Sequence, residues 1–361
     1  MQRSVILFTI SLCLFSCKSE DLDSIEPSLV QDLDSSLNYN DLVNQMNEEV
    51  VALFVEEPDD SGAMGRNRNG YFHVRFQVGM TKVSDYAVKF NSEEALSAYL
   101  KNLNYSFSHQ TEEGDFEYVI PDNLQQTNGY QPPSENDLAS GVAFFAYSLG
   151  ISLNSLIQSD WFNNSGELQS ARETLNGYDN SISDVLGYLK RSKRLLLDVD
   201  QKAPNRLLFN AIAFYSLGSY VGDKEAQEIG LDFARLALSQ VDSLEGYFIE
   251  GGGWDSSYNG VATMLSFELF TLLAQNNQLE ELPSLGQIIA RAAYWQSTRV
   301  LNSGEISTEG NTRVYPGGEE FLGNEKGVDV LKTVKSFFYM SILSGDDTYQ
   351  KLARRVIEFY D

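Results

Sequence analysis

Two glycine-rich segments carry the residues of this sequence that are best suited to bind or transform a ligand. The first runs from Gly246 to Gly260 and includes three consecutive glycines, which let a ligand approach the backbone closely. It supplies the following polar and aromatic side chains: Glu250, Trp254, Asp255, Tyr258 and Asn259. Such convergence is typical of binding loops. A structural interpretation stays open, in which Asp255 or Ser256 caps a helix and Tyr258 belongs to the core.

The second segment runs from Ser307 to Phe321 and supplies the cation that the first segment lacks, Arg313. Its other candidate ligand-binding residues are Asn311 and Tyr315, and it also contains Glu309 and Glu319. Each segment comes directly before a predicted helix rich in aromatic and small residues. If these helices are equivalent members of one ring, both segments lie at the same end of the molecule. The alternative is a long surface loop with solvated charges.

A third candidate is His109, which follows a predicted helix and precedes an acidic stretch. Histidine exchanges protons near neutral pH, although at a helix end it is often only a cap or a surface group. The other histidine, His73, is interpreted as structural. Two histidines leave little scope for a zinc site. We therefore predict no metal and no other cofactor, while acids such as Asp255 leave calcium open.

Helical periodicity extends through nearly all of the chain after residue 38. The predicted helices span residues 41–54, 91–107, 135–158, 183–197, 204–220, 223–241, 257–274, 283–301, 326–343 and 346–360. The exception is Tyr71–Val78, where apolar residues alternate as in a short strand. The segment between 158 and 183 is rich in Asn, Ser and Gly and is expected to be a linker.

The helices form two alternating kinds, which indicates repeated helical hairpins. The stretches Ala143–Gly150 and Ala211–Gly218 agree at five of eight positions. The helices that begin near Glu135, Asn205, Ser257 and Lys326 are rich in aromatics, Ala and Gly, and their partners near Ser183, Asp223, Pro283 and Asp346 carry more charge. An apolar inner ring and an amphipathic outer ring would produce this contrast. The sequence therefore predicts an all-α fold.

This arrangement resembles the (α/α) toroid enzymes, which include many polysaccharide lyases and glycoside hydrolases. The resemblance covers roughly residues 90 to 361 and rests on the hairpins and the two glycine-rich segments. It implies an incomplete (α/α) toroid over residues 134–361, preceded by an N-terminal helical region over 39–133. A tetratricopeptide-like solenoid is a rival interpretation, but its repeats of about 34 residues are shorter than the spacing of the matched helices.

The resemblance implies a polysaccharide or oligosaccharide partner and one of two reactions. In a lyase, Asn259 and Arg313 would bind the carboxylate of a uronate. Tyr258 or His109 would remove the neighbouring C5 proton, and a tyrosine would protonate the leaving oxygen. Trp254 would stack on a sugar ring.

In a hydrolase, two carboxylates would instead serve as acid and base, with inversion expected if they lie ~6.5–9.5 Å apart. The candidates are Glu250, Asp255, Glu309 and Glu319. A third alternative is a non-catalytic glycan-binding protein, because aromatic residues also suit sugar stacking without chemistry.

The N-terminus has the layout of a removable export signal. A charged start is followed by the apolar run Val5–Phe15, which is shorter than the ~20 residues of a membrane-spanning helix. Leu14–Cys17 resembles the bacterial lipobox, which implies cleavage after residue 16 and lipid, such as palmitate, on Cys17. An ordinary signal peptide with an incidental cysteine is the alternative.

Residues 17–38 are acidic and sparsely apolar, as expected of a flexible tether. Lys18–Asp23 resembles the signal that sends lipoproteins of Bacteroidetes-type bacteria to the outer face of the outer membrane. The alternative is the acidic start of a solvated tether. We expect a lipid-anchored protein of the outer membrane, exposed at the cell surface.

The charge of the chain limits its partners. Its 51 acidic and 26 basic residues give a formal net charge of −25. Nucleic acid is therefore an unsuitable partner, because phosphate binding needs a basic surface. Anionic lipid would also repel the protein, so the lipid on Cys17 is the expected membrane contact.

Overall fold

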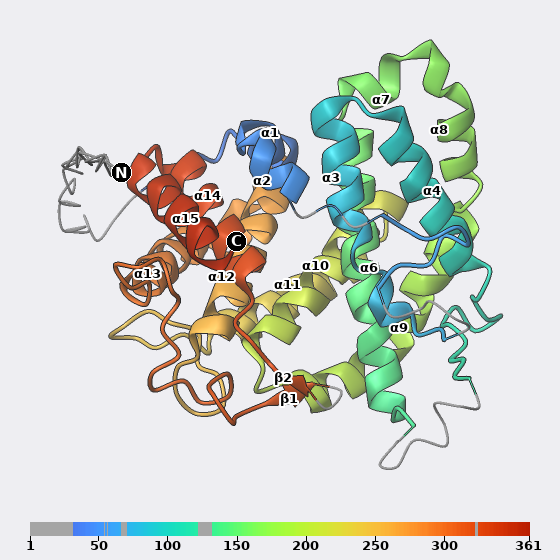
Figure 1. Ribbon diagram of the computed structural model, residues 1–361. Helices are drawn as coiled ribbons and strands as arrows, with labels where there is room; N and C mark the ends of the chain where they lie inside the picture. The colour runs from blue at the N-terminus through green and yellow to red at the C-terminus, as the bar shows by residue number, and fades with distance from the viewer. Residues whose placement is uncertain (1–31, 54, 56, 66–70, 122–131, 322–323) are drawn as a thin grey trace, which may run out of the picture.

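The structure is a computed structural model, and it describes residues 32–361 except 54, 56, 66–70, 122–131 and 322–323. The predicted signal peptide, Cys17 and most of the acidic tether lie outside the described residues. The described chain is an all-α assembly of helical hairpins, as the periodicity predicted (Figure 1). It also contains one pair of two-residue antiparallel strands, β1 (Glu320–Phe321) and β2 (Asn324–Glu325).

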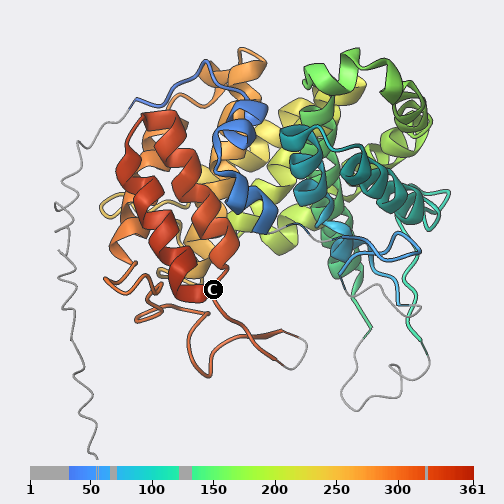
Figure 2. The same ribbon diagram turned by 45° about the horizontal axis from the view of Figure 1, so that its top comes forward.

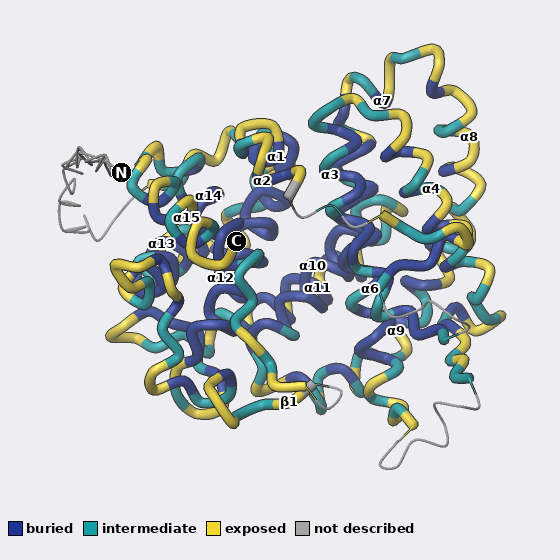
Figure 3. Tube along the Cα trace, viewed as in Figure 1, coloured by how far each residue is buried: buried dark blue, intermediate teal, exposed yellow. Residues whose placement is uncertain are grey.

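Four inner helices make up the centre of the molecule. They are α6 (Glu135–Ile157), α10 (Pro204–Val221), α12 (Ser256–Gln275) and α14 (Val330–Ser344). Contacts join α6 to α10, α10 to α12 and α12 to α14 in series. Figure 3 shows them largely buried. By length and composition α6 could cross a membrane, but 89% of its apolar window is buried inside the protein, as in a core helix.

Each inner helix is followed by an amphipathic outer helix that packs back against it. The outer helices are α9 (Asp179–Asp200), α11 (Lys224–Leu238), α13 (Leu285–Thr298) and α15 (Asp347–Tyr360). The predicted inner and outer rings are thereby confirmed. Because the chain returns along an outer helix each time, the four inner helices run in the same direction. Their N-terminal ends therefore meet at one end of the ring.

Two N-terminal helices complete the ring that the four hairpins leave open. Helix α1 (Tyr39–Gln45) contacts α3, α12 and α14, and α3 (Met80–Phe90) contacts α6. Helix α4 (Glu93–Phe107) packs on α3 from outside. Figure 2 shows α1 between the red α14–α15 hairpin and the N-terminal helices on the other side. The N-terminal region thus takes part in the toroid.

Several local expectations differ from the structure. The predicted helix 41–54 is divided into α1 and α2 (Glu48–Leu53). The alternating segment 71–78 is not a strand along its length: only Phe72 pairs, with Val119, and a 3₁₀ helix, η1 (Val74–Gln77), follows. The His73 side chain caps the start of η1, since its Nδ1 accepts a hydrogen bond from the backbone N–H of Arg75 at 3.2 Å.

The expected linker between α6 and α9 is itself helical. It contains α7 (Asp160–Asn164), η2 (Gly166–Leu168) and α8 (Gln169–Asn176). Another short turn, η3 (Leu279–Glu281), lies between α12 and α13. These pieces are short, and α7 and η2 each bury a single large side chain, Phe162 and Leu168. Their sequences therefore carry little periodic signal.

The N-terminal ends of the inner helices define a surface that we call the toroid mouth. It consists of η1, the first turns of α6, α10 and α12, and the segments 242–255 and 300–329, except residues 322–323, that lead into α12 and α14. The side chain of Ser134 caps α6 in a reciprocal capping box with Asp137, and Pro204 occupies the first turn of α10. Both glycine-rich segments belong to this mouth.

A buried polar network crosses the ring below the mouth. Lys335 of α14 lies 3.0 Å from Asp85 of α3, and the hydroxyl of Tyr39 in α1 donates to the same carboxylate. Tyr147 of α6 donates to Glu268 of α12 at 2.7 Å. Burial raises the pKa of Glu268 to about 7, although the charge of Lys335 opposes the effect. Helices far apart in the sequence are therefore linked through paired polar groups.

Candidate functional site

The two glycine-rich segments lie against each other at the toroid mouth. The backbone N–H of Thr312 donates to the carbonyl oxygen of Trp254 at 3.0 Å, and the Thr312 hydroxyl donates to the carbonyl of Glu250 at 2.7 Å. The Trp254 ring covers Gly310, where an added Cβ would lie 2.8 Å from a ring carbon. Gly310 has a φ of 78°, so its lack of a side chain serves both the backbone shape and this contact.

Asp255 is the residue that joins the two segments. Its Oδ1 accepts from the backbone N–H groups of Ser257 and Tyr258, which caps α12, and its Oδ2 accepts from those of Arg313 and Val314. The side chain is fully buried. With four donors on its two oxygens, Asp255 holds the loops in place. It offers no exposed oxygen for acid or base chemistry, contrary to its expected role in catalysis.

Asn259 and Asn311 are likewise committed to protein contacts. The Asn259 amide accepts from the backbone of Phe248 and donates to Gln296 at 2.8 Å, and it is fully buried. The Asn311 amide bonds to Ser256 and to the carbonyl of Val314. Since these amides do not face solvent, the structure gives them a positioning role in place of the substrate contacts expected from the sequence.

Tyr258 and four charged side chains form the most concentrated set of reactive groups at the mouth, which we call the Tyr258 cluster: Glu250, Arg313, Glu319 and Lys326 surround the tyrosine. Arg313 forms ion pairs with both Glu250 and Glu319. The Tyr258 hydroxyl donates to Glu319 Oε2 at 2.8 Å and accepts from Lys326 Nζ at 2.5 Å. A continuous chain of hydrogen bonds therefore runs from an amine through a phenol to a carboxylate.

The two cations of the cluster also lie over the Tyr258 ring. The guanidinium carbon of Arg313 is 4.4 Å from the ring centre, and Lys326 Nζ is 4.2 Å from it. Such cation–π contacts fix the ring while its hydroxyl stays engaged. About a third of each cationic side chain remains exposed, at 33% for Arg313 and 30% for Lys326. Both can therefore be reached from solvent.

The surroundings shift the pKa values of this cluster in different directions. Burial raises the pKa of Tyr258, against the charge of Arg313, so the phenol is protonated at neutral pH. Burial lowers the pKa of Lys326, so this lysine loses its proton more readily than an ordinary lysine and forms a neutral amine at lower pH.

The two carboxylates of the cluster differ from each other. Burial raises the pKa of Glu250, although the hydrogen bond from Arg313 opposes it. Burial also acts to raise the pKa of Glu319, but the hydrogen bond from Tyr258 and the charges of Lys326 and Arg313 outweigh it, so that pKa is lowered. Glu319 is therefore the more acidic of the two carboxylates.

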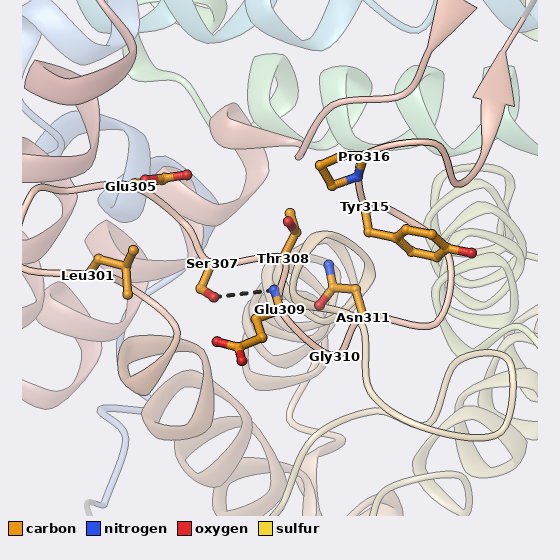
Figure 4. A pocket seen from close by; sticks show the side chains of 9 residues that line it. All are labelled: Leu301, Glu305, Ser307, Thr308, Glu309, Gly310, Asn311, Tyr315 and Pro316. Atoms are coloured by element: carbon orange, nitrogen blue, oxygen red, sulfur yellow. Dashed lines mark hydrogen bonds between the residues drawn. The ribbon is translucent and has the colours of Figure 1, made fainter.

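Exposed aromatic side chains flank the cluster. Trp254 is 38% exposed and Tyr315 is 42% exposed, which are high values for residues of this size. Tyr315 lines an open pocket of about 480 Å³ (Figure 4). The pocket is lined by Leu301, Glu305, Ser307, Thr308, Glu309, Gly310, Asn311, Tyr315 and Pro316. Gly310 lines this pocket and also lies against the Trp254 ring, so Trp254 is next to one wall of the pocket, and exposed rings of this kind suit stacking on sugar.

His109 lies away from this group of residues. Its ring stacks on Phe72 with centroids 4.0 Å apart, and its Nδ1 is 2.9 Å from the carbonyl oxygen of Tyr105. These contacts hold it at the C-terminal end of α4. His109 therefore belongs to the packing of the N-terminal helices. None of these contacts joins it to the Tyr258 cluster, where its expected role as a base would have placed it.

Lys326 is not among the candidate residues that the sequence predicts. Nothing in its immediate sequence neighbourhood distinguishes it from a surface lysine, and its one signal is its place in the segment before an inner helix.

Metal binding is not supported by the side chains that the structure describes. The described part of the chain holds no group of three or more His, Cys, Asp or Glu side chains arranged to bind an ion. The calcium alternative gains no support there.

Comparison with known proteins supports the fold and goes no further. No protein-family model matches the chain, and no curated protein matches it. Among solved structures, the chain is similar to one described as a sugar epimerase from a ruminal bacterium, with a TM-score of 0.52 and 11% sequence identity. The match covers 88% of this chain and 85% of that one. The two proteins therefore share a fold over most of their lengths, including the N-terminal region here.

Proposed function

We propose that the protein binds a polysaccharide at the toroid mouth and cleaves it by β-elimination beside a uronate carboxylate. The observation that carries this proposal is the hydrogen-bond chain from Lys326 through Tyr258 to Glu319, placed directly beside Arg313. The fold shared with a protein described as a sugar epimerase supports a carbohydrate as the ligand.

Arg313 would receive the substrate carboxylate. It is partly exposed, and a guanidinium matches the two oxygens of a carboxylate. Neutralising that carboxylate lowers the cost of removing the C5 proton, because negative charge develops next to it in the transition state. Trp254 and Tyr315 would contact the neighbouring sugar rings.

The proton transfers can be assigned to two residues of the cluster. The neutral amine of Lys326 takes the C5 proton, and the electron pair of the C5–H bond forms the C4–C5 double bond as the C4–O bond breaks. The leaving oxygen takes the proton of the Tyr258 hydroxyl. The proton held by Lys326 then returns to Tyr258 along their 2.5 Å hydrogen bond, which restores both groups. Glu319 orients the Tyr258 hydroxyl.

A panel of acidic and neutral polysaccharides tests the proposal. The purified protein is incubated with each glycan while ultraviolet absorbance of unsaturated products and formation of reducing ends are recorded together. Elimination raises both signals on uronate-containing substrates. Reducing ends without absorbance would replace elimination by hydrolysis. Neither signal, together with measurable glycan binding, would show a non-catalytic binding protein.

Inverting hydrolysis is a second candidate, and one specific observation favours it. Glu250 and Glu319 are held by the same guanidinium, and the pKa of Glu250 is raised while that of Glu319 is lowered. Opposite shifts are what an acid and a base need. Against it, Glu250 is only 3% exposed, whereas a general acid must reach the glycosidic oxygen. We therefore place elimination first.

We also propose that the protein acts at the cell surface, tethered to the outer membrane through lipid on Cys17. The support is the sequence of the first 23 residues, which contains a short apolar run, a tetrapeptide similar to the lipobox and an acidic segment after it. A polysaccharide too large to cross the membrane would be accessible in that location.

A further inference from the structure

The open pocket of about 480 Å³ lies beside the residues of the proposed cleavage, and of its lining only Tyr315 enters that reaction. The pocket is formed by the stretch of chain from Leu301 to Pro316. Figure 4 shows Leu301 and Glu305 on one side, Pro316 and Tyr315 on the other, and Thr308 between them. Its volume falls within the ~300–1,000 Å³ of typical small-ligand sites, so it has room for a sugar ring.

The backbone around the pocket is fastened to two helices of the toroid. The N–H of Ile306 donates to the hydroxyl of Tyr360 in α15 at 3.2 Å. Ser256, the first residue of α12, donates its hydroxyl to the carbonyl oxygen of Ser307 at 2.8 Å. The Asn311 amide in turn donates to the Ser256 hydroxyl oxygen at 3.0 Å. The pocket is therefore shaped before a ligand arrives, which reduces the entropy cost of binding.

The pocket presents hydrogen-bonding groups that the protein leaves available. Ser307 Oγ accepts from the backbone N–H of Glu309 at 3.3 Å, and no described residue accepts the proton of this hydroxyl (Figure 4). The Thr308 hydroxyl has no partner among the described residues, and the exposed carboxylates of Glu305 and Glu309 pair with no described cation. Sugar hydroxyls both donate and accept, so they match this combination of hydroxyls and carboxylates.

Apolar surface adjoins these polar groups. The side chains of Leu301, Tyr315 and Pro316 are exposed, and the Trp254 ring lies behind the wall made by Gly310. The C–H faces of a sugar ring can pack on such surfaces while the sugar hydroxyls bond to the polar groups. The pocket thus combines both kinds of contact that a pyranose needs.

The charged groups that line the pocket are both acidic, Glu305 and Glu309. Arg299 reaches the same loop, but its guanidinium donates to the backbone carbonyl of Glu309, lies 5.7 Å from the centre of the Trp295 ring and does not line the pocket. A uronate carboxylate placed here would meet two like charges and no lining cation. An uncharged sugar avoids that repulsion.

We propose that this pocket binds one uncharged sugar unit, separately from the Tyr258 cluster. The inference rests on the carbohydrate ligand of the proposed function and goes beyond that function, because it requires no cleavage. Arg313 of the cluster and Tyr315 of the pocket are two residues apart, so their Cα atoms lie within about 7 Å of each other. A glycan that contains both uncharged sugars and uronates would therefore reach both sites.

Binding of uncharged hexasaccharides tests the pocket without any catalytic step. The purified protein is titrated by calorimetry with hexamers of glucose, mannose, galactose and xylose, and with a glucuronate hexamer. We expect Tyr315→Ala to weaken binding of the preferred uncharged hexamer about tenfold and Thr308→Val about fivefold, because a ring contact or a hydrogen bond is lost. Thr308→Val should leave any binding of the glucuronate hexamer unchanged.

Tyr86→Ala and Thr174→Val are the matched controls, because Tyr86 lies on α3, Thr174 lies on α8 and neither lines the pocket. Both should bind as the native protein does, and thermal melting verifies the folding of every variant. Three results would each overturn the pocket: no binding of any uncharged hexamer, unaltered affinity in folded Tyr315→Ala or Thr308→Val, or an equal loss of glucuronate binding in Thr308→Val.

The cleavage proposal can fail or hold independently of this site. If uronate glycans are cleaved while the pocket fails these tests, only the pocket inference is wrong. If uncharged hexamers bind through Tyr315 and Thr308 but no glycan is cleaved, only the cleavage proposal is wrong.

Discussion

Tyr258 is the residue on which the proposed chemistry converges. It receives a hydrogen bond from Lys326, gives one to Glu319 and lies beneath the guanidinium of Arg313. Burial keeps its phenol protonated at neutral pH, so it is suited to donate a proton and unsuited to act alone as a base. This favours Lys326 as the group that removes the proton from carbon.

Replacing the hydroxyl of Tyr258 tests that assignment. Tyr258→Phe keeps the ring beneath both cations but removes the proton donor, so kcat should fall by about 10²–10⁴ while KM changes little. Steady-state kinetics on the preferred glycan measure both. Tyr220→Phe is the control, because Tyr220 lies at the other end of α10 and its hydroxyl bonds to Asp179. Equal activity of Tyr258→Phe and the native protein would remove Tyr258 from the mechanism.

Asp255 illustrates a residue whose importance is structural. Asp255→Ala leaves four backbone N–H groups without their acceptor, and we expect a loss of about 2–4 kcal/mol in the free energy of unfolding. Chemical denaturation measures it. Ser92→Ala, which removes a single-bond cap from α4, should cost only about 1 kcal/mol. A normally stable but inactive Asp255→Ala protein would instead point to direct catalysis.

The sequence could predict which loops meet, but not which of their side chains face solvent. Glycine content and the position before an inner helix identified both segments. The amides of Asn259 and Asn311 and the carboxylate of Asp255 turn inward, because the loop backbones need partners for their buried N–H and C=O groups. Lys326 turns toward Tyr258 through contacts that only the folded chain creates.

At the scale of helices, the polar network inside the ring sets a pH dependence. The pKa of Glu268 is raised in the folded state from 4.5 to about 7, chiefly by burial, so the unfolded chain loses its proton first as the pH rises. The contribution of this group to stability is therefore favourable below about pH 4.5 and is lost as the pH rises toward 7. The neighbouring Lys335, Lys332, Asp85 and Tyr147 act on the same carboxylate.

Glu268→Gln should remove the loss of stability that ionisation of the buried Glu268 causes at high pH. It retains a partner for the Tyr147 hydroxyl and carries no charge, so at pH 8 we expect the variant to be more stable than the native protein by about 2–3 kcal/mol. The difference should vanish at pH 4. Urea denaturation at both pH values measures it, with exposed Glu280→Gln as the control. A variant less stable than the native protein at pH 8 would show that the favourable interactions of the ionised Glu268, such as the charge of Lys335, outweigh the cost of its burial.

Helix prediction succeeded where apolar periodicity was long and failed where it was short. The eight helices of the inner and outer rings had enough turns for the pattern to be clear. Helix α3, at Met80–Phe90, was not among the helices predicted from the sequence, which left the segment between the expected strand 71–78 and the helix 91–107 unassigned. Closure of the ring by α1 and α3 depends on contacts between distant parts of the chain, such as Asp85 with Lys335, which local patterns do not report.

Over the whole molecule, acidic residues greatly outnumber basic ones. The chain carries a net charge of −25, yet the toroid mouth gathers Arg75, Arg206, Arg313 and Lys326. The positive ends of the inner helix dipoles point the same way. Segments 242–255 and 300–329 also carry ten acidic residues, so local contacts with these cations, and not the field of the mouth as a whole, would have to hold an anionic sugar chain under the proposed function.

The proposed membrane anchor depends on one residue. Cys17→Ala should abolish incorporation of radiolabelled palmitate and release the protein from the outer membrane fraction, because one cysteine supplies the lipid attachment. Cys13→Ala, within the predicted signal, should leave both unchanged. Labelling in cells followed by membrane fractionation measures this. Persistent palmitate on Cys17→Ala would contradict the anchor.

The masses of the products test the central claim most directly. In β-elimination no water enters the products, so the masses of the two fragments from one cleaved oligouronate sum to the mass of the substrate, and one fragment is unsaturated. In hydrolysis the sum exceeds the substrate by one water. Mass spectrometry of a single cleavage of a defined oligouronate should give the first result. A sum larger by one water would contradict the proposed elimination through Lys326 and Tyr258.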